Sequence, residues 1–216
     1  MPRAANKFMS MTAHGLPGLS PGPGSPDVKI RYQKAWRALP DGVGAGVESA
    51  SNAAKSLMDS PQLRPADATP KLVEIAQGLG QSAGAAAGAG NGGAPGATAS
   101  AVAAMVAANV ALTTAYTAAA SSGPEPAAAT TYTQGLQKVV AAAAGAAVSA
   151  IAAMTDMHKC LTVCPGGIHG PGVVTKGSSS VFINHLPAAR EGDKVFEAAG
   201  GPDPIALGAP TVNIGG

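Results

Sequence analysis

The fold of this chain is decided by a short repeat, Gly177-Ser178-Ser179-Ser180-Val181-Phe182-Ile183. Two related copies occur, Gly24-Ser25-Pro26-Asp27-Val28-Lys29-Ile30 and Gly208-Ala209-Pro210-Thr211-Val212-Asn213-Ile214. Two β-branched residues two positions apart, after a glycine-containing turn, indicate a short strand with one buried face. We therefore expect three related strands whose apolar residues lie in internal packing or at a common base: Val28, Ile30, Val181, Ile183, Val212 and Ile214.

The residues after the first two copies also correspond. Ala35-Trp36-Arg37 follows the first copy at the spacing at which Ala188-Ala189-Arg190 follows the second. A turn is expected before each of these segments, at 31–34 and 184–187, and we interpret His185 as a turn residue. The repeat thus predicts β-hairpins, each made of a strand, a turn and a return strand.

The first copy is separated from the second by a long Ala/Gly-rich segment, residues 42–155, which we interpret as an all-α insertion. The expected fold class is therefore α+β, with a discontinuous β domain at residues 1–41 and 156–216. Residues 80–97 are so rich in glycine and alanine that we expect them to be flexible. The remaining segment predicts four helices: 43–58, one that starts at Thr69-Pro70, 98–120 and 130–154, the last two as an antiparallel pair.

The last two of these helices are almost free of charge. Residues 101–120 contain no charged side chain and are just long enough to cross a bilayer. However, Asn109 and three threonines interrupt this segment, and neither end has an aromatic belt. We expect a soluble bundle, with a pair of chaperone-shielded membrane helices as the alternative. The expected contacts are Val102, Met105, Val106, Val110 and Leu112 against Leu136, Val139, Val140, Val148 and Ile151.

Composition restricts the class of protein. Hydrophobic residues make up 46% of the chain but aromatic residues only 3%, so a conventional aromatic-rich core is excluded. The net charge is +2 and the basic residues are not clustered, which argues against a nucleic acid as partner. The N-terminal residues lack the apolar core of a signal peptide, and we therefore expect cytoplasmic assembly.

The most reactive side chains follow the insertion, in the stretch 156–170. His158, Cys160, Cys164 and His169 lie within it, and His14 precedes the first repeat copy much as His169 precedes the second. Imidazole and thiolate ligands on short loops are typical of a tetrahedral Zn²⁺ site. We predict the ligands His14, His158, Cys164 and His169, with Cys160 as the substitute for Cys164.

Two other interpretations of the cysteines stay open. They could form a short disulfide or remain free. A catalytic Cys/His pair would need an oriented base and oxyanion donors, and Asp156 is the sole orienting residue that the sequence suggests. We therefore expect that this protein is not an enzyme.

One segment, Pro187-Ala188-Ala189-Arg190-Glu191-Gly192-Asp193, resembles the motif after which the PAAR family is named. The runs 181–184, 164–170 and Asp156-Met157-His158-x-Cys160 are also similar to that family. The resemblance covers residues 1–41 and 156–216. It departs from the family at 34–37, where Lys-Ala-Trp-Arg replaces the motif, at Phe196-Glu197, where some relatives have a cysteine, and at 4–14, which match only loosely.

The resemblance implies a small conical domain of pseudo-threefold β-hairpins, with a structural Zn²⁺ near its point and a flat base. Such a base caps a trimeric VgrG-type spike protein, one copy per trimer. The implied function is a tip that sharpens the spike of a contractile injection system, type VI secretion or a related one. The insertion would carry a cargo effector or a chaperone, and the tip would contact the target membrane transiently when it is delivered or secreted. The alternative is an effector whose insertion enters the target membrane.

Overall fold

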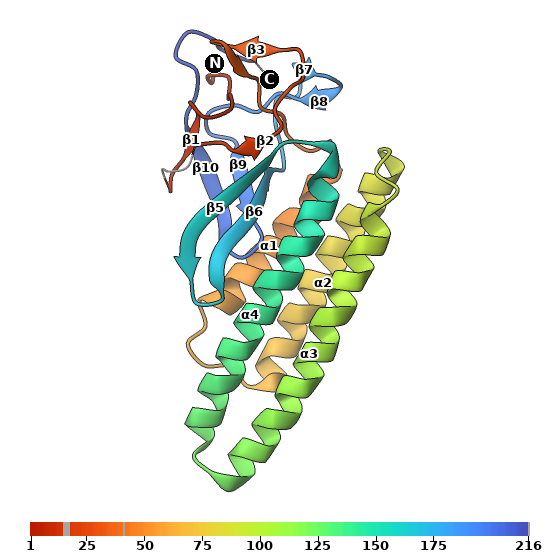
Figure 1. Ribbon diagram of the computed structural model, residues 1–216, viewed down its shortest axis with the longest axis vertical. Helices are drawn as coiled ribbons and strands as arrows, with labels where there is room; N and C mark the ends of the chain where they lie inside the picture. The colour runs from red at the N-terminus through yellow and green to blue at the C-terminus, as the bar shows by residue number, and fades with distance from the viewer. Residues whose placement is uncertain (15–17, 41, 216) are drawn as a thin grey trace.

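The computed structural model describes residues 1–14, 18–40 and 42–215, and its fold is α+β. Asp41, at the expected domain boundary, lies outside the described residues. Figure 1 shows a helical bundle alongside a smaller β part, with both chain termini at the far end of the β part. The helices in the described residues are α1 (Gly44–Met58), α2 (Pro65–Gly88), α3 (Ala94–Ser122) and α4 (Glu125–Ile151), followed by the 3₁₀ turn η1 (Ala152–Met154).

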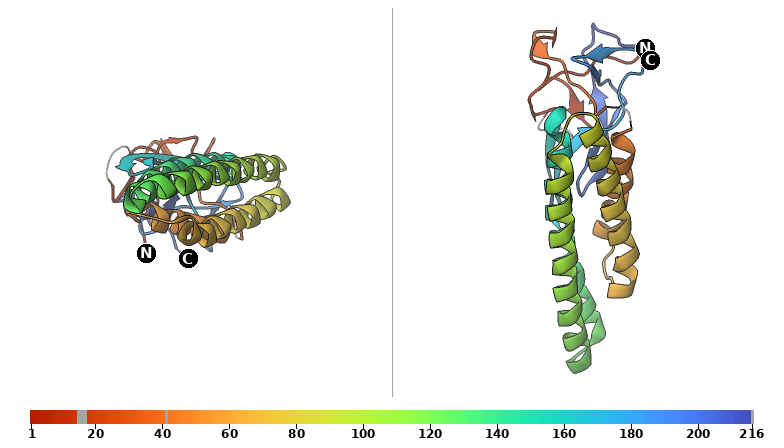
Figure 2. Two further views of the ribbon diagram at one scale, coloured as in Figure 1. Left: turned by 90° about the horizontal axis from the view of Figure 1, so that it is seen from below. Right: turned by 90° about the vertical axis from the view of Figure 1, so that its right-hand side faces the viewer.

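The helices form two antiparallel hairpins, α1 with α2 and α3 with α4, stacked as two layers (Figure 2). Gly46 and Gly78 lie where α1 and α2 approach most closely, since a Cβ on Gly78 would come within 2.6 Å of the Gly46 carbonyl oxygen. The helices of this hairpin are therefore held closer than larger residues would allow.

Two predictions about the helices are wrong. Helix α2 begins at Pro65, not at Thr69-Pro70, because Pro65 suits the first helical position and Asp67 accepts the backbone N–H of Arg64 (3.4 Å). The segment 80–97 is not unstructured, since α2 continues to Gly88 and α3 starts at Ala94. Packing overrides the weak propensity here, because Ala83, Ala86 and Ala94 are buried in the bundle core.

Helix α3 is buried along a narrow stripe only. It packs mainly on α4 and α2, and the residues that this buries recur at helical spacing: Ala94, Thr98, Ala101 and Met105. Val106 and Val110, expected in the helix contacts, are instead 51% and 60% exposed. Both residues lie on the side of α3 that faces away from α2 and α4, and in the described residues no other helix or strand packs on that side. On the facing helix, Leu136, Val140, Val148 and Ile151 are buried as predicted, and Val139 is half-buried.

The main sheet has six antiparallel strands in the order β1-β10-β9-β6-β5-β2. Helices α1 and α4 pack against its β10, β9 and β6 strands. The strand bounds are β1 Met11–Thr12, β2 Pro21–Gly22, β5 Met157–Cys164, β6 Gly167–Val174, β9 Lys194–Glu197 and β10 Gly201–Leu207.

Both predicted hairpins are present. The first pairs β3 (Lys29–Ile30) with β4 (Gln33–Lys34), and the second pairs β7 (Phe182–Ile183) with β8 (Leu186–Pro187). Each has a two-residue turn in which both residues have positive φ: 50° and 67° at Arg31 and Tyr32, 51° and 65° at Asn184 and His185. This is the geometry of turns that match the twist of the paired strands.

The third repeat copy pairs with the N-terminal segment. The N–H of Ala4 donates to the Val212 carbonyl (2.8 Å), as Ala35 does to Val28 (2.9 Å) and Ala188 to Val181 (2.9 Å). The residue that follows each of these three donors takes part in a closed ring of backbone hydrogen bonds. The N–H of Ala5 donates to the Ala189 carbonyl (2.9 Å), that of Ala189 to the Trp36 carbonyl (3.0 Å) and that of Trp36 to the Ala5 carbonyl (3.1 Å). Residues 3–6 thus supply the return strand that the third copy lacks.

The repeat residues divide between the interior and the surface. Ile30, Ile183 and Ile214 are buried in one cluster against which Val181 and Val212 pack, whereas Val28 is 38% exposed. Trp36 is fully buried and belongs to internal packing, while Phe182 is 53% exposed.

Candidate metal centre

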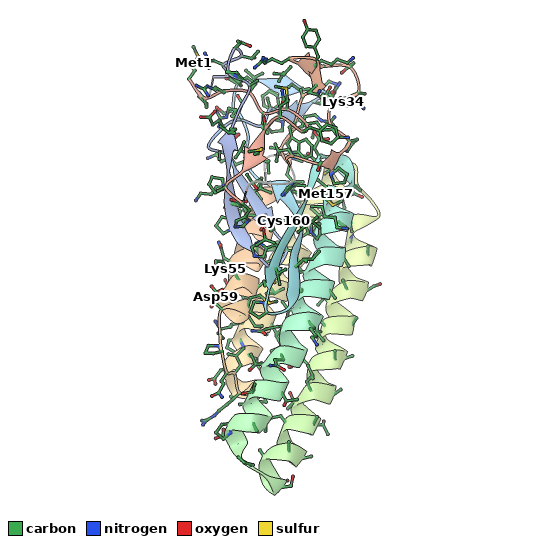
Figure 3. The ribbon with its side chains drawn as sticks, turned by 60° about the vertical axis from the view of Figure 1, so that its left-hand side comes forward. Met1, Lys34, Lys55, Asp59, Met157 and Cys160 are labelled. Carbon is green, nitrogen blue, oxygen red and sulfur yellow. The ribbon has the colours of Figure 1, made fainter. Side chains whose placement is uncertain are left out.

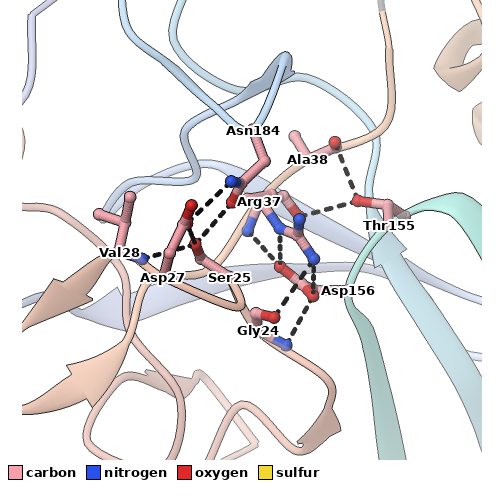
Figure 4. Close-up of polar contacts among 9 residues, drawn as sticks. All are labelled: Gly24, Ser25, Asp27, Val28, Arg37, Ala38, Thr155, Asp156 and Asn184. Carbon is pink, nitrogen blue, oxygen red and sulfur yellow. Dashed lines mark hydrogen bonds and ion pairs between the residues drawn. The ribbon is translucent and has the colours of Figure 1, made fainter.

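The helical insertion enters and leaves the β part at one point, marked by a buried ion pair between Arg37 and Asp156 (Figure 4). Asp156 accepts hydrogen bonds from the Arg37 backbone N–H (2.8 Å), Nε (2.9 Å) and Nη2 (2.9 Å), and from the Gly24 N–H (2.7 Å). Arg190 makes the same three bonds to Asp193, at 2.7, 3.2 and 3.0 Å. The helices of the described residues therefore lie, in the sequence, between an arginine and an aspartate that pair in the same way as Arg190 and Asp193, and Asp156 leads directly into β5.

Four side chains from four segments converge beside this point: His14 after β1, Cys160 on β5, His169 on β6 and Glu197 on β9. Their candidate ligand atoms all lie within 4.8 Å of one another. The Cys160 Sγ is 3.6 Å from His14 Nδ1 and 3.7 Å from His169 Nδ1, and His169 Nδ1 is 2.6 Å from Glu197 Oε2. Figure 3 shows Cys160 between the end of the molecule that carries Met1 and the level of Lys55 on α1.

The cluster contains two of the four predicted ligands, His14 and His169, and Cys160 in the position expected for Cys164. A β-bulge accounts for the exchange. Cys160 pairs with Gly170 but Val163 pairs with Ile168, so β5 has one residue more than β6 between these pairs. Because side chains alternate along a strand, the extra residue turns Cys164 to the opposite face, where it packs on the helical core.

His158 lies outside this group. It precedes Cys160 by two residues on the same strand, is 1% exposed, and its Nδ1 has no hydrogen-bond partner among the described residues. Burial lowers the pKa of its imidazole, which favours the neutral form of the side chain.

Glu197 was not among the ligands predicted from the sequence. The one signal for it was the departure from the resemblance at Phe196-Glu197, the place where the resemblance implies a cysteine in some members. The side chain of Glu197 is fully buried, and its Oε1 has no hydrogen-bond partner in the described part of the chain. Asp203 on β10 lies beside His14: its Oδ1 accepts the Ala13 N–H (3.0 Å), and its Oδ2 lies 3.0 Å from His14 Nδ1, the nitrogen that also faces the Cys160 sulfur.

The residues present fit a divalent metal ion. Burial raises the pKa of the Cys160 thiol and of the Glu197 carboxyl, and a bound cation would favour the ionised form of both. Two imidazole nitrogens, a sulfur and a carboxylate oxygen form a donor set that Zn²⁺ accepts. Gly200 leaves the necessary room, because a Cβ there would collide with the Glu197 carboxylate and the His169 ring.

Comparison with protein families gives one match. A family model described as the PAAR motif matches residues 126–196 and 167–216, and the first match begins inside α4. No curated protein and no solved structure matches the chain.

Proposed function

We propose, from the match of the PAAR motif model to residues 126–196 and 167–216, that this chain is a PAAR-domain protein and forms the metal-stabilised tip of the spike of a contractile injection system. The observation that carries the proposal is the motif Pro187–Asp193, which begins at the last residue of the β7–β8 hairpin and whose Arg190 and Asp193 form an ion pair (3.0 Å). A role at the tip of the spike is what membership in this family implies. The metal, the partner and the role of the insertion are our own proposals.

We propose that the base of the cone is pseudo-threefold and caps a trimeric VgrG-type spike as a single copy. The ring of hydrogen bonds that joins Ala5, Trp36 and Ala189 supports this, because it relates three segments of one chain in the same way. A chain with three similar edges can meet three identical subunits at once. The surface offers exposed apolar area at Tyr32 (94%) and Phe182 (53%), both on the hairpins.

Native mass measurement of the complex with the spike protein tests this proposal. We expect one copy of the chain per spike trimer. Three copies per trimer would contradict it, because the relation between the three hairpins would then have no role at the junction.

We propose that a structural Zn²⁺ is held by His14, Cys160, His169 and Glu197. With four protein ligands no coordination position remains for a substrate, which favours a structural over a catalytic site. A metal contributes on the order of 10 kcal/mol of folding free energy in small sites. Such a contribution would compensate for the small core of the β part, whose two clusters contain, among the described residues, eight and seven buried residues, seven of these fifteen being alanine.

We propose the cone at residues 1–41 and 156–216 and an insertion at 42–155 that carries a cargo effector or a chaperone. Assembly in the cytoplasm and delivery with the spike follow from such a role. Both helices that contact the β part, α1 and α4, bury one face there, and α2 and α3 remain available for a partner.

The second candidate is a secreted effector whose insertion enters the target membrane. Residues 94–122 and 125–154 are long and apolar enough to cross one, and only 11% of the apolar window in α3 is buried. The exposed apolar surface of α3 is the one observation that favours the second candidate.

A further inference from the structure

Strand β9, which carries Glu197, is shared between the cone and the helical insertion. Val195 belongs to the core of the cone, whereas Phe196 and, just after the strand, Ala198 and Ala199 belong to the core of the helical bundle. The strand is thus packed on the helices through one face while its other face holds the Glu197 carboxylate toward His169 (2.6 Å). Displacing the bundle would remove the helical layer behind this candidate ligand and leave its backbone held by the pairing of β9 with β6 and β10 alone.

Helix α1 contacts the backbone around Glu197 directly, through two residues one turn apart. The Ser51 hydroxyl, buried within the interface, donates a hydrogen bond to the carbonyl oxygen of Glu197 itself. The aliphatic chain of Lys55 lies over Gly201, where a Cβ would collide with it, and Gly201 has a φ of +74°. These two contacts bracket Gly200, the glycine that leaves room for the Glu197 carboxylate and the His169 ring.

The hairpin that carries the other strand-borne ligands is held by the same helices. A Cβ on Gly166, in the turn between β5 and β6, would come within 2.6 Å of the Gln137 carbonyl of α4 and 2.9 Å of the Met58 sulfur of α1. Gln137 in turn donates to the Met58 carbonyl at 3.0 Å, which ties α4 to the end of α1. The strands of His169 and Glu197 pack on this pair of helices, and the strand of Cys160 reaches the helical core through Met157 and Cys164 at its two ends.

From these contacts we infer that the helical insertion is part of the support of the metal centre, with Ser51 as a positioning residue for Glu197. Metal binding and docking of the bundle then stabilise each other, because each favours the same position of β9. The inference rests on the proposed metal site and adds a function to the insertion. The bundle helps to hold the metal, so it is more than a carrier of cargo.

The test follows two signals of the full-length chain during thermal unfolding. Far-ultraviolet circular dichroism reports the helices, and the fluorescence of Trp36, which is fully buried in the cone, reports the β part. We expect both signals to change at one midpoint, and removal of metal by a chelator to lower both midpoints together. If the chain binds metal but its removal shifts the fluorescence alone, the inference is overturned while the metal site stands. If the chain binds no metal, both are overturned.

The Ser51→Ala variant tests the positioning role with a readout that a purely structural role would not change. Loss of a residue that supports a metal ligand typically lowers metal affinity about 10-fold to 100-fold. We expect a loss in that range for Co²⁺, measured by titration of its thiolate charge-transfer absorption, which reports bonding to Cys160. The matched control is Ser49→Ala, on the same helix but facing Glu74 of α2 at 3.5 Å.

The outcomes separate cleanly. Weakened Co²⁺ binding in Ser51→Ala together with unchanged binding in Ser49→Ala supports the inference. Equal affinities in both variants and the parent chain overturn it. If Ser51→Ala does not fold, the chelator experiment on the parent chain still decides.

Discussion

At the scale of single residues, the two cysteines differ in environment although they lie four positions apart. Cys160 is 2% exposed and lies within 3.7 Å of two imidazole nitrogens, whereas Cys164 lies across the bulge and packs on the helical core. A thiol can serve as a metal ligand only where its sulfur can converge with other donors. The two residues should therefore respond differently to the same substitution.

We predict that Cys160→Ser lowers the zinc content of the purified chain strongly, from about one ion per chain, while Cys164→Ser leaves it near the parent value. The reason is that Cys160 lies in the cluster and Cys164 does not. Elemental analysis measures both variants, and each serves as the control for the other. The reverse result would restore the ligand set expected from the sequence, with Cys164.

The sequence indicated a metal site but could not decide its full ligand set. Two histidines and two cysteines within one short stretch are a strong local signal, and His14 and His169 do lie together. The bulge that turns Cys164 away leaves no pattern in the residue types, because it depends on the register of β5 against β6. Glu197 comes from a distant strand and was visible only as a replacement for a cysteine of some relatives.

At the scale of elements, the hairpins were predictable and the ends of the helices were not. A β-branched pair after a glycine-containing turn is a local signal, and both predicted hairpins are present at 29–34 and 182–187. The helical state of 80–88 depends on packing of small side chains such as Ala83 and Ala86 against other helices, which composition does not reveal. The partner of the third copy was missed because residues 3–6 adjoin it only in the folded chain.

The Arg37–Asp156 pair is one contact between the two segments of the β part, and it lies where the chain passes into and out of the helices. We predict that Asp156→Ala destabilises the chain by about 3–5 kcal/mol, because Arg37, whose side chain is 9% exposed, would keep a buried charge without its partner. The Gly24 and Arg37 backbone N–H groups would lose their acceptor as well. Urea unfolding followed by Trp36 fluorescence measures the change.

Asp27→Ala is the matched control for this experiment. Asp27 is an exposed aspartate in the same region, hydrogen-bonded to Ser25 and Asn184 at 3.1 and 2.8 Å. Its loss should shift the unfolding midpoint much less, since solvent replaces its contacts. Equal losses in the two variants would mean that the buried pair has no special role at the point of insertion.

At the scale of the whole molecule, the two ends of the long axis are built from different secondary structure (Figure 1). The end with both termini carries the two hairpins, and the opposite end is formed by the turn between α3 and α4, which extends beyond the tip of the β5–β6 hairpin (Figures 1 and 2). If the hairpin end binds the spike, the α3–α4 turn points toward the target. In that arrangement the ends of α3 and α4 would be the first part of the chain to reach a target membrane.

We predict that the full-length chain is soluble without detergent and does not float with lipid vesicles, because the bundle buries one side of both apolar helices. Helix α4 is buried along Tyr132, Leu136 and Val140, and it carries Lys138, whose charge costs about 2.5–3.5 kcal/mol at the centre of a bilayer.

The variants Met105→Asp and Val110→Asp distinguish the two sides of α3. Met105 is 1% exposed and its variant should unfold at a much lower temperature, whereas Val110 is 60% exposed and its variant should melt within a few degrees of the parent. Vesicle flotation and thermal melting measure these outcomes. A parent chain that partitions into vesicles, together with a Val110→Asp variant that no longer does so, would show that the exposed side of α3 faces lipid and would favour the membrane-entering effector.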